Sequence, residues 1–475
     1  MSRRAPGQLR VLLASFALFA VACAEPVIPA IDAPATVTPT PAPTPTAAPT
    51  VENQPTPTPP PFAGEPGITA DELRVGVIYD VGVDPVTDQI SLSALQAVQA
   101  WAESVNADGG LALRTVVVEP IETRPLLEDH AEAIDRACNS DLFALVGSSA
   151  RFDGLGVEQL ESCLLPDYPA NANSIDRIES AVTTLSNPIT GNLWQAGWAA
   201  NYAENQPEAA VAAATLLLDL PVSIADGERM IEAASAQGME FVARPQISID
   251  TDFAAVVEEL DQAGTELVIW RADSGRLLEL LQAFDDADVA RPQIDCAQGC
   301  YSDVWISAAE QLGNEVSIWL PHVPLEESFD SPELNRYLFW LGLVHGVDHE
   351  PTSTGIMAWS AGLLFEAAVD IATGVGTPDY DPNNLTRSGV LAATETITEW
   401  DANGVHGLSN PADGTPSACY LAMTLSGGAW ERSYPLRSGV LDCEPENLVE
   451  LTLTAGAGAA PDPTATPVEP PDDEG

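Results

Sequence analysis

The sequence predicts an α/β fold of two lobes, each a parallel sheet covered by helices, joined by a hinge of several strands. At 475 residues the chain is long enough for two domains with full cores. From Leu73 onward, short apolar runs alternate with helical periodicity, which is the pattern of βαβ units. The pattern restarts near Trp194, which indicates a second sheet.

The first half contains the elements of one sheet. Apolar residues at three- and four-residue spacing from Leu92 to Val105 predict a helix that stops at Gly109-Gly110. The strands expected around it are Leu73–Tyr79, Arg114–Glu119 and Leu142–Val146, and the further helices are Leu126–Ala137 and Val157–Leu164.

The second half supplies the other sheet and then a return to the first. We expect strands over Val211–Leu218, Phe241–Ile249, Leu267–Trp270 and Val316–Leu320, and helices over Trp194–Tyr202, Gly227–Gln237, Phe253–Ala263 and Gly275–Phe284. Two long helices, Pro332–Val344 and Ile356–Ile371, return to the first sheet. The expected first lobe is 67–188 plus 322–432, and the second is 189–321 plus 433–455. Ligands of such sheets bind beyond the carboxyl ends of the strands.

The N-terminus has the features of an export signal. Arginines precede an apolar run from Val11 to Ala22 that is too short for a membrane span. Ala20-Val21-Ala22-Cys23 resembles a bacterial lipobox, so we expect a signal peptide over 1–23 and lipidation of Cys23; an ordinary signal peptidase site is the alternative. Residues 24–66 are rich in Pro and Thr and predict a disordered stalk, and 456–475 a disordered acidic tail.

Six cysteines remain after Cys23, an even number that indicates disulfides in an exported protein. Sequence proximity favours three pairs, although six cysteines permit fifteen connectivities. The favoured pairs are Cys138 with Cys163, Cys296 with Cys300, and Cys419 with Cys443.

Charge and composition exclude several functions. The formal net charge is -52 and the chain contains no lysine, which excludes P-loops, pyridoxal Schiff bases and Ser-Lys hydrolases. The acidic surface repels phosphate backbones, so nucleic acid is not expected as a partner. His345, Asp348, His349 and Glu350 are close enough in sequence to ligate a metal, but they fall in a loop, and we expect no metal and no cofactor.

Several segments resemble one family, the type I periplasmic binding proteins of branched-chain amino acid importers. They are Gly67-Ile68-Thr69 before the first strand, Val105-Asn106-Ala107-Asp108-Gly109-Gly110, Ala144 to Ser148, Asp252-Phe253, and Trp359-Ser360-Ala361. The resemblance covers about Gly67 to Trp430. It implies two Rossmann-like lobes that close on a small solute, which is then passed to an ABC permease.

The resemblance also suggests ligand contacts in loops that follow the strands. In the first lobe these are Ser148, Ser149 and Arg151, beside the N-terminus of an expected helix that would favour an anion, and then Asn171 and Asn173. The two serines could instead cap that helix, and the asparagines could be ordinary turn residues. In the second lobe Arg271 and Asp273 could bind the two ends of a zwitterion, or form a solvated loop, and Gln298 lies between two close cysteines.

The leading hypothesis is therefore a monomeric solute-binding lipoprotein on the outer face of a bacterial cell membrane. Its expected partners are a small polar solute, an amino acid or amide, and an ABC permease, and it touches the membrane only through its lipid. A ligand sensor or surface scaffold of the same fold is the alternative, suggested by the stalk, the tail and a missing cleft aromatic after the first strand. A hydrolase that uses acidic residues is the third hypothesis, and we expect no catalysis.

Overall fold

The computed structural model describes residues 64–287, 289–347 and 349–452, which all belong to one compact unit. The expected signal peptide with Cys23, most of the expected stalk and the expected tail lie outside these residues.

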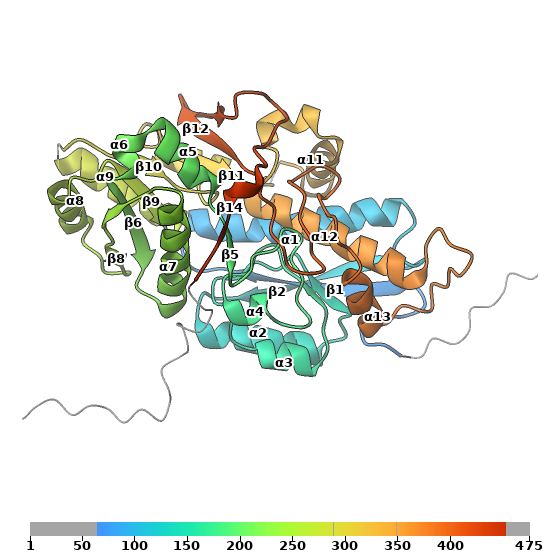
Figure 1. Ribbon diagram of the computed structural model, residues 1–475. Helices are drawn as coiled ribbons and strands as arrows, with labels where there is room; N and C mark the ends of the chain where they lie inside the picture. The colour runs from blue at the N-terminus through green and yellow to red at the C-terminus, as the bar shows by residue number, and fades with distance from the viewer. Residues whose placement is uncertain (1–63, 288, 348, 453–475) are drawn as a thin grey trace, which may run out of the picture. The chain divides into compact units, whose positions relative to one another are not determined.

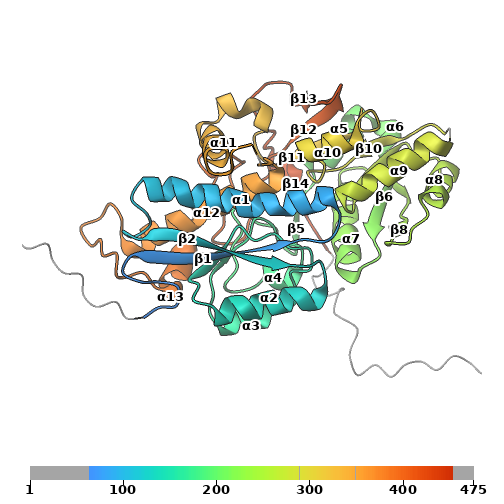
Figure 2. The ribbon, with the colours of Figure 1, turned by 180° about the vertical axis from the view of Figure 1, so that it is seen from behind.

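The first sheet has the order β2-β1-β3-β4, and all of its pairs are parallel. Helices cover both faces, α1 and α12 on one and α2 and α3 on the other, and α11 packs on the outer side of α1 (Figures 1 and 2). A strand buried on both faces is a nearly continuous apolar run, as β1 is from Val75 to Tyr79. The strands are β1 (Glu72–Asp80), β2 (Thr115–Thr123), β3 (Ala144–Val146) and β4 (Asp167–Tyr168). The helices are α1 (Pro85–Ala107), α2 (Leu127–Asn139), α3 (Val157–Ser162), α4 (Ile175–Ile178), α11 (Pro332–His345), α12 (Ser353–Thr373) and α13 (Arg387–Thr394).

Two long helices organise the first lobe. At the start of α1, Asp84 accepts hydrogen bonds from the backbone N–H groups of Val86 and Thr87. Helix α12 crosses α1 closely where Gly362 faces Trp101: a Cβ at Gly362 would lie 2.6 Å from the indole. In the described part of the chain, α12 alone is long and apolar enough to cross a membrane. However, 72% of its apolar window is buried, as in a core helix.

The second sheet has eight strands in the order β13-β12-β11-β10-β9-β6-β7, with β8 also paired to β6. Helices α5 and α7 pack on one face, and α8, α9 and α10 on the other. The strands are β6 (Ala213–Leu218), β7 (Phe241–Ala243), β8 (Gln246–Ile247), β9 (Leu267–Arg271), β10 (Gln293–Asp295), β11 (Ser317–Leu320), β12 (Leu421–Ser426) and β13 (Ala429–Tyr434). The helices are α5 (Gly197–Asn205), α6 (Pro207–Ala210), α7 (Pro221–Ala236), α8 (Phe253–Gln262), α9 (Ser274–Ala287) and α10 (Asp303–Ala309).

Three local expectations differ from the structure. The helix expected from Trp194 begins only at Gly197, because Leu193–Gln195 forms strand β5 and pairs with β14 (Leu448–Glu450). The strand expected over Phe241–Ile249 is split at Pro245, which has no N–H to donate to a ladder. Strand β12 and most of β13 fall in the segment expected in the first lobe, 322–432, but both extend the second sheet: β12 pairs antiparallel with β11, and β13 pairs antiparallel with β12.

The α/β fold class is confirmed, with parallel pairing throughout the first sheet and among β6 to β11 of the second. After β4, after β11 and after α13 the chain passes from one sheet to the other, so three connections join the lobes. The structure also contains the three disulfides that sequence proximity favours, Cys138–Cys163, Cys296–Cys300 and Cys419–Cys443.

Candidate functional site

A cavity of about 320 Å³ lies between the ends of strands from both sheets. From the first lobe it is lined by residues after β1, β3 and β4, and from the second lobe by residues after β6 and at the end of β9. All of these are carboxyl ends of strands, the position where open α/β sheets bind ligands. The cavity is therefore the main candidate site.

Six of the eight expected ligand-binding residues line this cavity. They are Ser149, Arg151, Asn171 and Asn173 from the first lobe, and Arg271 and Asp273 from the second. Their positions fit a shared site.

The other two expected residues do not line the cavity. The hydroxyl of Ser148 is fully buried and accepts a hydrogen bond from the Ile78 N–H at 3.1 Å, so it ties two strands together. The Gln298 side chain is exposed, and its Oε1 accepts a hydrogen bond from the Ser353 hydroxyl at 3.0 Å. Only its neighbour Gly299 reaches the cavity.

The expected helix N-terminus beside the serines is absent from this site. Helix α3 begins at Val157 behind Gly156, and no side chain caps it. Both expectations that depended on this helix are therefore wrong: its N-terminus does not offer an anion site at Ser148 and Ser149, and the serines do not cap it.

Charged groups meet across the cavity. Arg151 of the first lobe forms an ion pair with Asp273 of the second. Arg271 pairs instead with Asp226, at 2.7 Å between Nη2 and Oδ2. The expected Arg271 and Asp273 thus share a cavity, but each pairs with a different residue.

A further carboxylate, Asp80 at the end of β1, accepts a hydrogen bond from the Arg151 backbone N–H at 2.6 Å. Burial raises the pKa of the Asp80 carboxyl, and the contact with Arg151 opposes this rise. The cavity lining therefore contains three carboxylates and two guanidinium groups.

One buried side-chain polar atom in this lining lacks a partner among the described residues. The side-chain oxygen of Asn171 is buried and accepts no hydrogen bond from any described residue. A buried acceptor without a donor costs free energy, and ligand sites are where such groups find partners. Asn171 is thus suited to accept an N–H or O–H from a solute.

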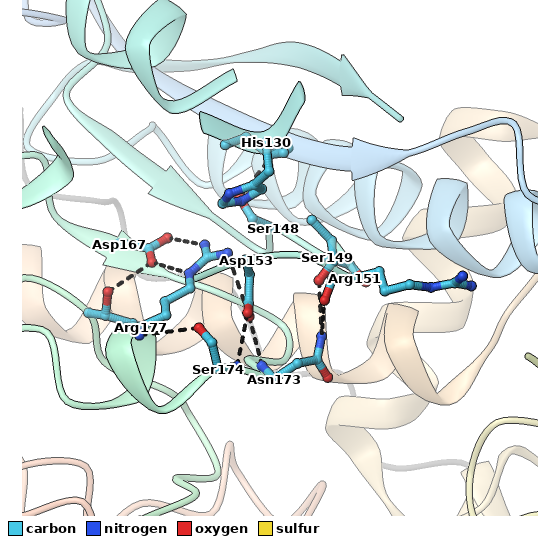
Figure 3. Close-up of polar contacts among 12 residues, drawn as sticks. His130, Ser148, Ser149, Arg151, Asp153, Asp167, Asn173, Ser174 and Arg177 are labelled. Atoms are coloured by element: carbon cyan, nitrogen blue, oxygen red, sulfur yellow. Dashed lines mark hydrogen bonds and ion pairs between the residues drawn. The ribbon is translucent and has the colours of Figure 1, made fainter. Parts of the chain in front are cut away.

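A buried polar network behind the cavity holds the two first-lobe loops together (Figure 3). Asp153 accepts hydrogen bonds from the backbone N–H groups of Asn173, at 2.7 Å, and Ser174, at 2.9 Å. The Asn173 amide donates in return to the Ala150 carbonyl at 3.0 Å. The loop after β3 is thereby fixed to the loop after β4.

Arg177 anchors this network through its guanidinium group. Its Nε and Nη2 each donate to Asp167 at 2.9 Å, and its Nη1 lies 4.0 Å from Asp153. All three side chains are buried, and burial raises the pKa of the Asp153 carboxyl while Arg177 opposes the rise. These residues were not predicted, because the segment around Arg177 is polar and nothing in its pattern marks the charge as buried.

Sequence analysis also missed part of the lining. Asp80, Thr87, Ser91, Asp226 and Thr354 add polar groups. The apolar part is mainly aliphatic, with Val83, Ile90, Leu218, Leu220 and Val222, and it includes one aromatic ring, Phe152.

The candidate metal ligands make other contacts, and His345 is not in a loop but is the last residue of α11. His345 Nε2 donates to the Gln96 carbonyl at 3.0 Å, and Glu350 accepts a hydrogen bond from the Val304 N–H at 2.9 Å. Asp348 lies outside the described residues. Among those that the structure does describe, no group of three His, Cys, Asp or Glu side chains is placed to hold a metal ion.

A family model described as a periplasmic binding protein matches residues 72–429, more than half of the chain. No curated protein matches the sequence.

Solved structures match the fold at low sequence identity. A fatty acid ABC transporter substrate-binding protein from Thermomonospora curvata is 15% identical with a TM-score of 0.66, covering 80% of this chain and 98% of its own. An R. palustris solute-binding protein in complex with benzoate is 14% identical with a TM-score of 0.62, covering 76% and 95%. A branched-chain amino acid transporter substrate-binding protein from Streptococcus pneumoniae, in complex with isoleucine, is 13% identical with a TM-score of 0.59, covering 75% and 97%.

Proposed function

Because the chain belongs to the periplasmic binding protein family, we propose that it captures a small polar solute outside the cytoplasm for an ABC importer. The solute is of the amino acid or amide kind. The observation that carries this proposal is the cavity of about 320 Å³ at the strand ends, lined with charged side chains from both lobes.

The charges of the cavity support a zwitterionic solute. Arg151 and Asp273 already pair with each other across the cavity. A solute carboxylate that pairs with Arg151 and a solute ammonium that pairs with Asp273 would replace one ion pair by two. An uncharged amide would instead use the open acceptor of Asn171 and the neighbouring hydroxyls.

The same lining disfavours the other ligand types named for the similar structures. A benzoate or a fatty acid carries one negative charge and a large apolar body, whereas this cavity has three carboxylates and one aromatic ring. An anion would meet net negative charge here. The aliphatic side chains at Val83, Leu218 and Val222 suit a short aliphatic group.

The export features complete the proposal. We place Cys23 as the lipidated residue that anchors the mature chain to the outer face of the membrane, and 24–66 as the stalk. The proposed first lobe keeps α11 to α13, and the proposed second lobe gains β12 and β13.

A thermal-shift screen tests the proposal. The probes are the standard amino acids, their amides, benzoate and octanoate, added to the soluble chain without its first 23 residues. We expect one amino acid or amide to stabilise the fold by ~2 to 4 kcal/mol at saturation and to raise Tm. Stabilisation by benzoate or octanoate alone would refute the solute class, and no stabilisation by any probe would refute the receptor function.

A further inference from the structure

We propose that the second lobe contains a separate groove that binds an uncharged saccharide. A cavity of about 340 Å³ lies between α5 and the strands β10 to β13. None of its lining residues lines the cavity between the strand ends of the two lobes, so this inference does not depend on the proposed solute receptor.

One face of the second sheet is apolar where helices cover it and polar beyond β9, and the groove lies over the polar part. Where α5 and α7 cover it, β6 and β9 present buried apolar residues such as Ala213 and Ile269. Beyond β9 the same face presents Gln293, Asp295 and Thr424. Helix α5 borders this polar part with a stripe at helical spacing, from Trp198 to Gln206.

Two half-buried aromatic rings form apolar platforms in the groove. Trp319 is backed by Trp198, with ring centroids 6.2 Å apart and planes at 5°. Tyr434 is backed by Tyr420, at 5.8 Å and 28°. The backing rings are buried and hold the outer rings in place, which gives rigid flat surfaces for the C–H face of a sugar ring.

The accessible polar groups of the groove are uncharged. They are side-chain amides at Asn201, Asn205, Gln206 and Gln293, with hydroxyls at Thr424 and Ser433. An amide both donates and accepts, as a sugar hydroxyl also does, so the two match in pairs. The lining contains no Arg or His side chain and the chain has no lysine, which disfavours an anionic ligand.

Two buried side chains refine this assignment. The Trp198 Nε1–H is buried in the lining and has no hydrogen-bond partner among the described residues, so a ligand hydroxyl that reaches it would supply the missing acceptor. The one carboxylate, Asp295, already accepts hydrogen bonds from the Tyr202 hydroxyl at 2.8 Å and the Ala297 N–H at 2.7 Å. With both oxygens engaged and the side chain buried, Asp295 is poorly placed to pair with a cation.

Saturation-transfer NMR on the exported chain tests the proposal, with maltose, cellobiose and diacetylchitobiose as probes and choline as the cationic control. We expect transfer to at least one disaccharide and none to choline. Trp319→Ala should weaken that binding by about tenfold, because it removes a stacking platform. The double variant Asn201→Ala/Asn205→Ala changes one half-buried and one exposed side chain of α5, neither of them in the core, and should weaken disaccharide binding as well.

The matched control is Arg151→Ala in the first lobe, which changes the cavity between the lobes and lines no part of the groove. Disaccharide binding should be unchanged in this variant. Transfer to none of the three disaccharides, transfer to choline alone, loss of binding in Arg151→Ala, or unchanged binding in the double asparagine variant would each overturn the proposal. Absence of disaccharide binding would leave the thermal-shift result for amino acids and amides unchanged, so the two proposals fail in distinguishable ways.

Discussion

At Asn171, solute affinity and the stability of the solute-free protein have opposite requirements. Its side-chain oxygen is buried beside the cavity and has no partner among the described residues. The folded chain therefore bears a desolvation cost of roughly 1 to 3 kcal/mol at this position, which a solute donor would relieve.

We predict that Asn171→Leu lowers solute affinity without lowering the stability of the solute-free protein. Asn171→Leu keeps the side-chain size and removes the orphaned acceptor, so the solute-free protein should be as stable as the wild type or more stable. Solute affinity should fall by about tenfold or more, since a hydrogen bond to the solute is lost. Urea unfolding and calorimetric titration measure the two quantities. If Asn171→Leu lowered stability and left affinity intact, Asn171 would be a structural residue.

A site residue could be predicted from the sequence where its place just after a strand was enough to put it in the cavity. Arg151, Asn171 and Arg271 follow strand ends, and all three line the cavity. Ser148 also follows a strand, but successive side chains of an extended chain point to opposite sides, and its hydroxyl points to β1. The bond between Asp153 and the loop after β4 joins residues about twenty positions apart, and no periodicity in a sequence reports such a contact.

At the scale of elements, the turn after β3 depends on a glycine. Gly147 has a φ of +69°, and a Cβ there would lie 2.3 Å from Cγ2 of Val98 in α1. Gly82, after β1, has a φ of +90° but nothing within 4 Å of its Cβ position. The two glycines share the left-handed backbone and differ in the space around them.

We therefore expect Gly147→Ala to cost more stability than Gly82→Ala. The left-handed conformation costs an alanine roughly 1 to 2 kcal/mol at either site, and overpacking against Val98 adds about 1 to 3 kcal/mol at Gly147. The free energy of unfolding in urea measures both. Equal losses of unfolding free energy in the two variants would show that Val98 in α1 moves aside without cost and does not constrain the turn.

Long helices with a repeated apolar pattern could be predicted from the sequence, and very short strands could not. The stripe from Leu92 to Val105 lies in α1, and the apolar run from Ile356 lies in α12. Strands β4 and β10 span only 2 and 3 residues, too few to show a period. The placement of β12 depends on hydrogen bonds to β11, which is about a hundred residues earlier in the chain, so the sequence pattern could not assign it to a sheet.

At the scale of the whole molecule, the described chain passes between its two sheets three times, and loops from both sheets line one cavity. The fold class followed from the alternation of strands and helices, and the family model agrees with it. The identity of the solute did not follow, because it depends on which side chains from the two lobes meet. The lipid anchor at Cys23 stays a prediction.

The central claim is that one solute is held by side chains of both lobes. Calorimetric titration with the solute found by thermal shift tests it in three variants that each remove one arginine: Arg151→Ala in the first lobe, Arg271→Ala in the second, and the control Arg244→Ala. Arg244 is 46% exposed, pairs with Glu228 at 3.7 Å and does not line the cavity. All three variants change the net charge equally, so long-range electrostatics cancels in the comparison.

We predict one solute per chain, a loss of affinity of about tenfold or more in both Arg151→Ala and Arg271→Ala, and wild-type affinity in Arg244→Ala. Wild-type affinity in either of the two cavity variants would mean that one lobe does not hold the solute, and would contradict the claim.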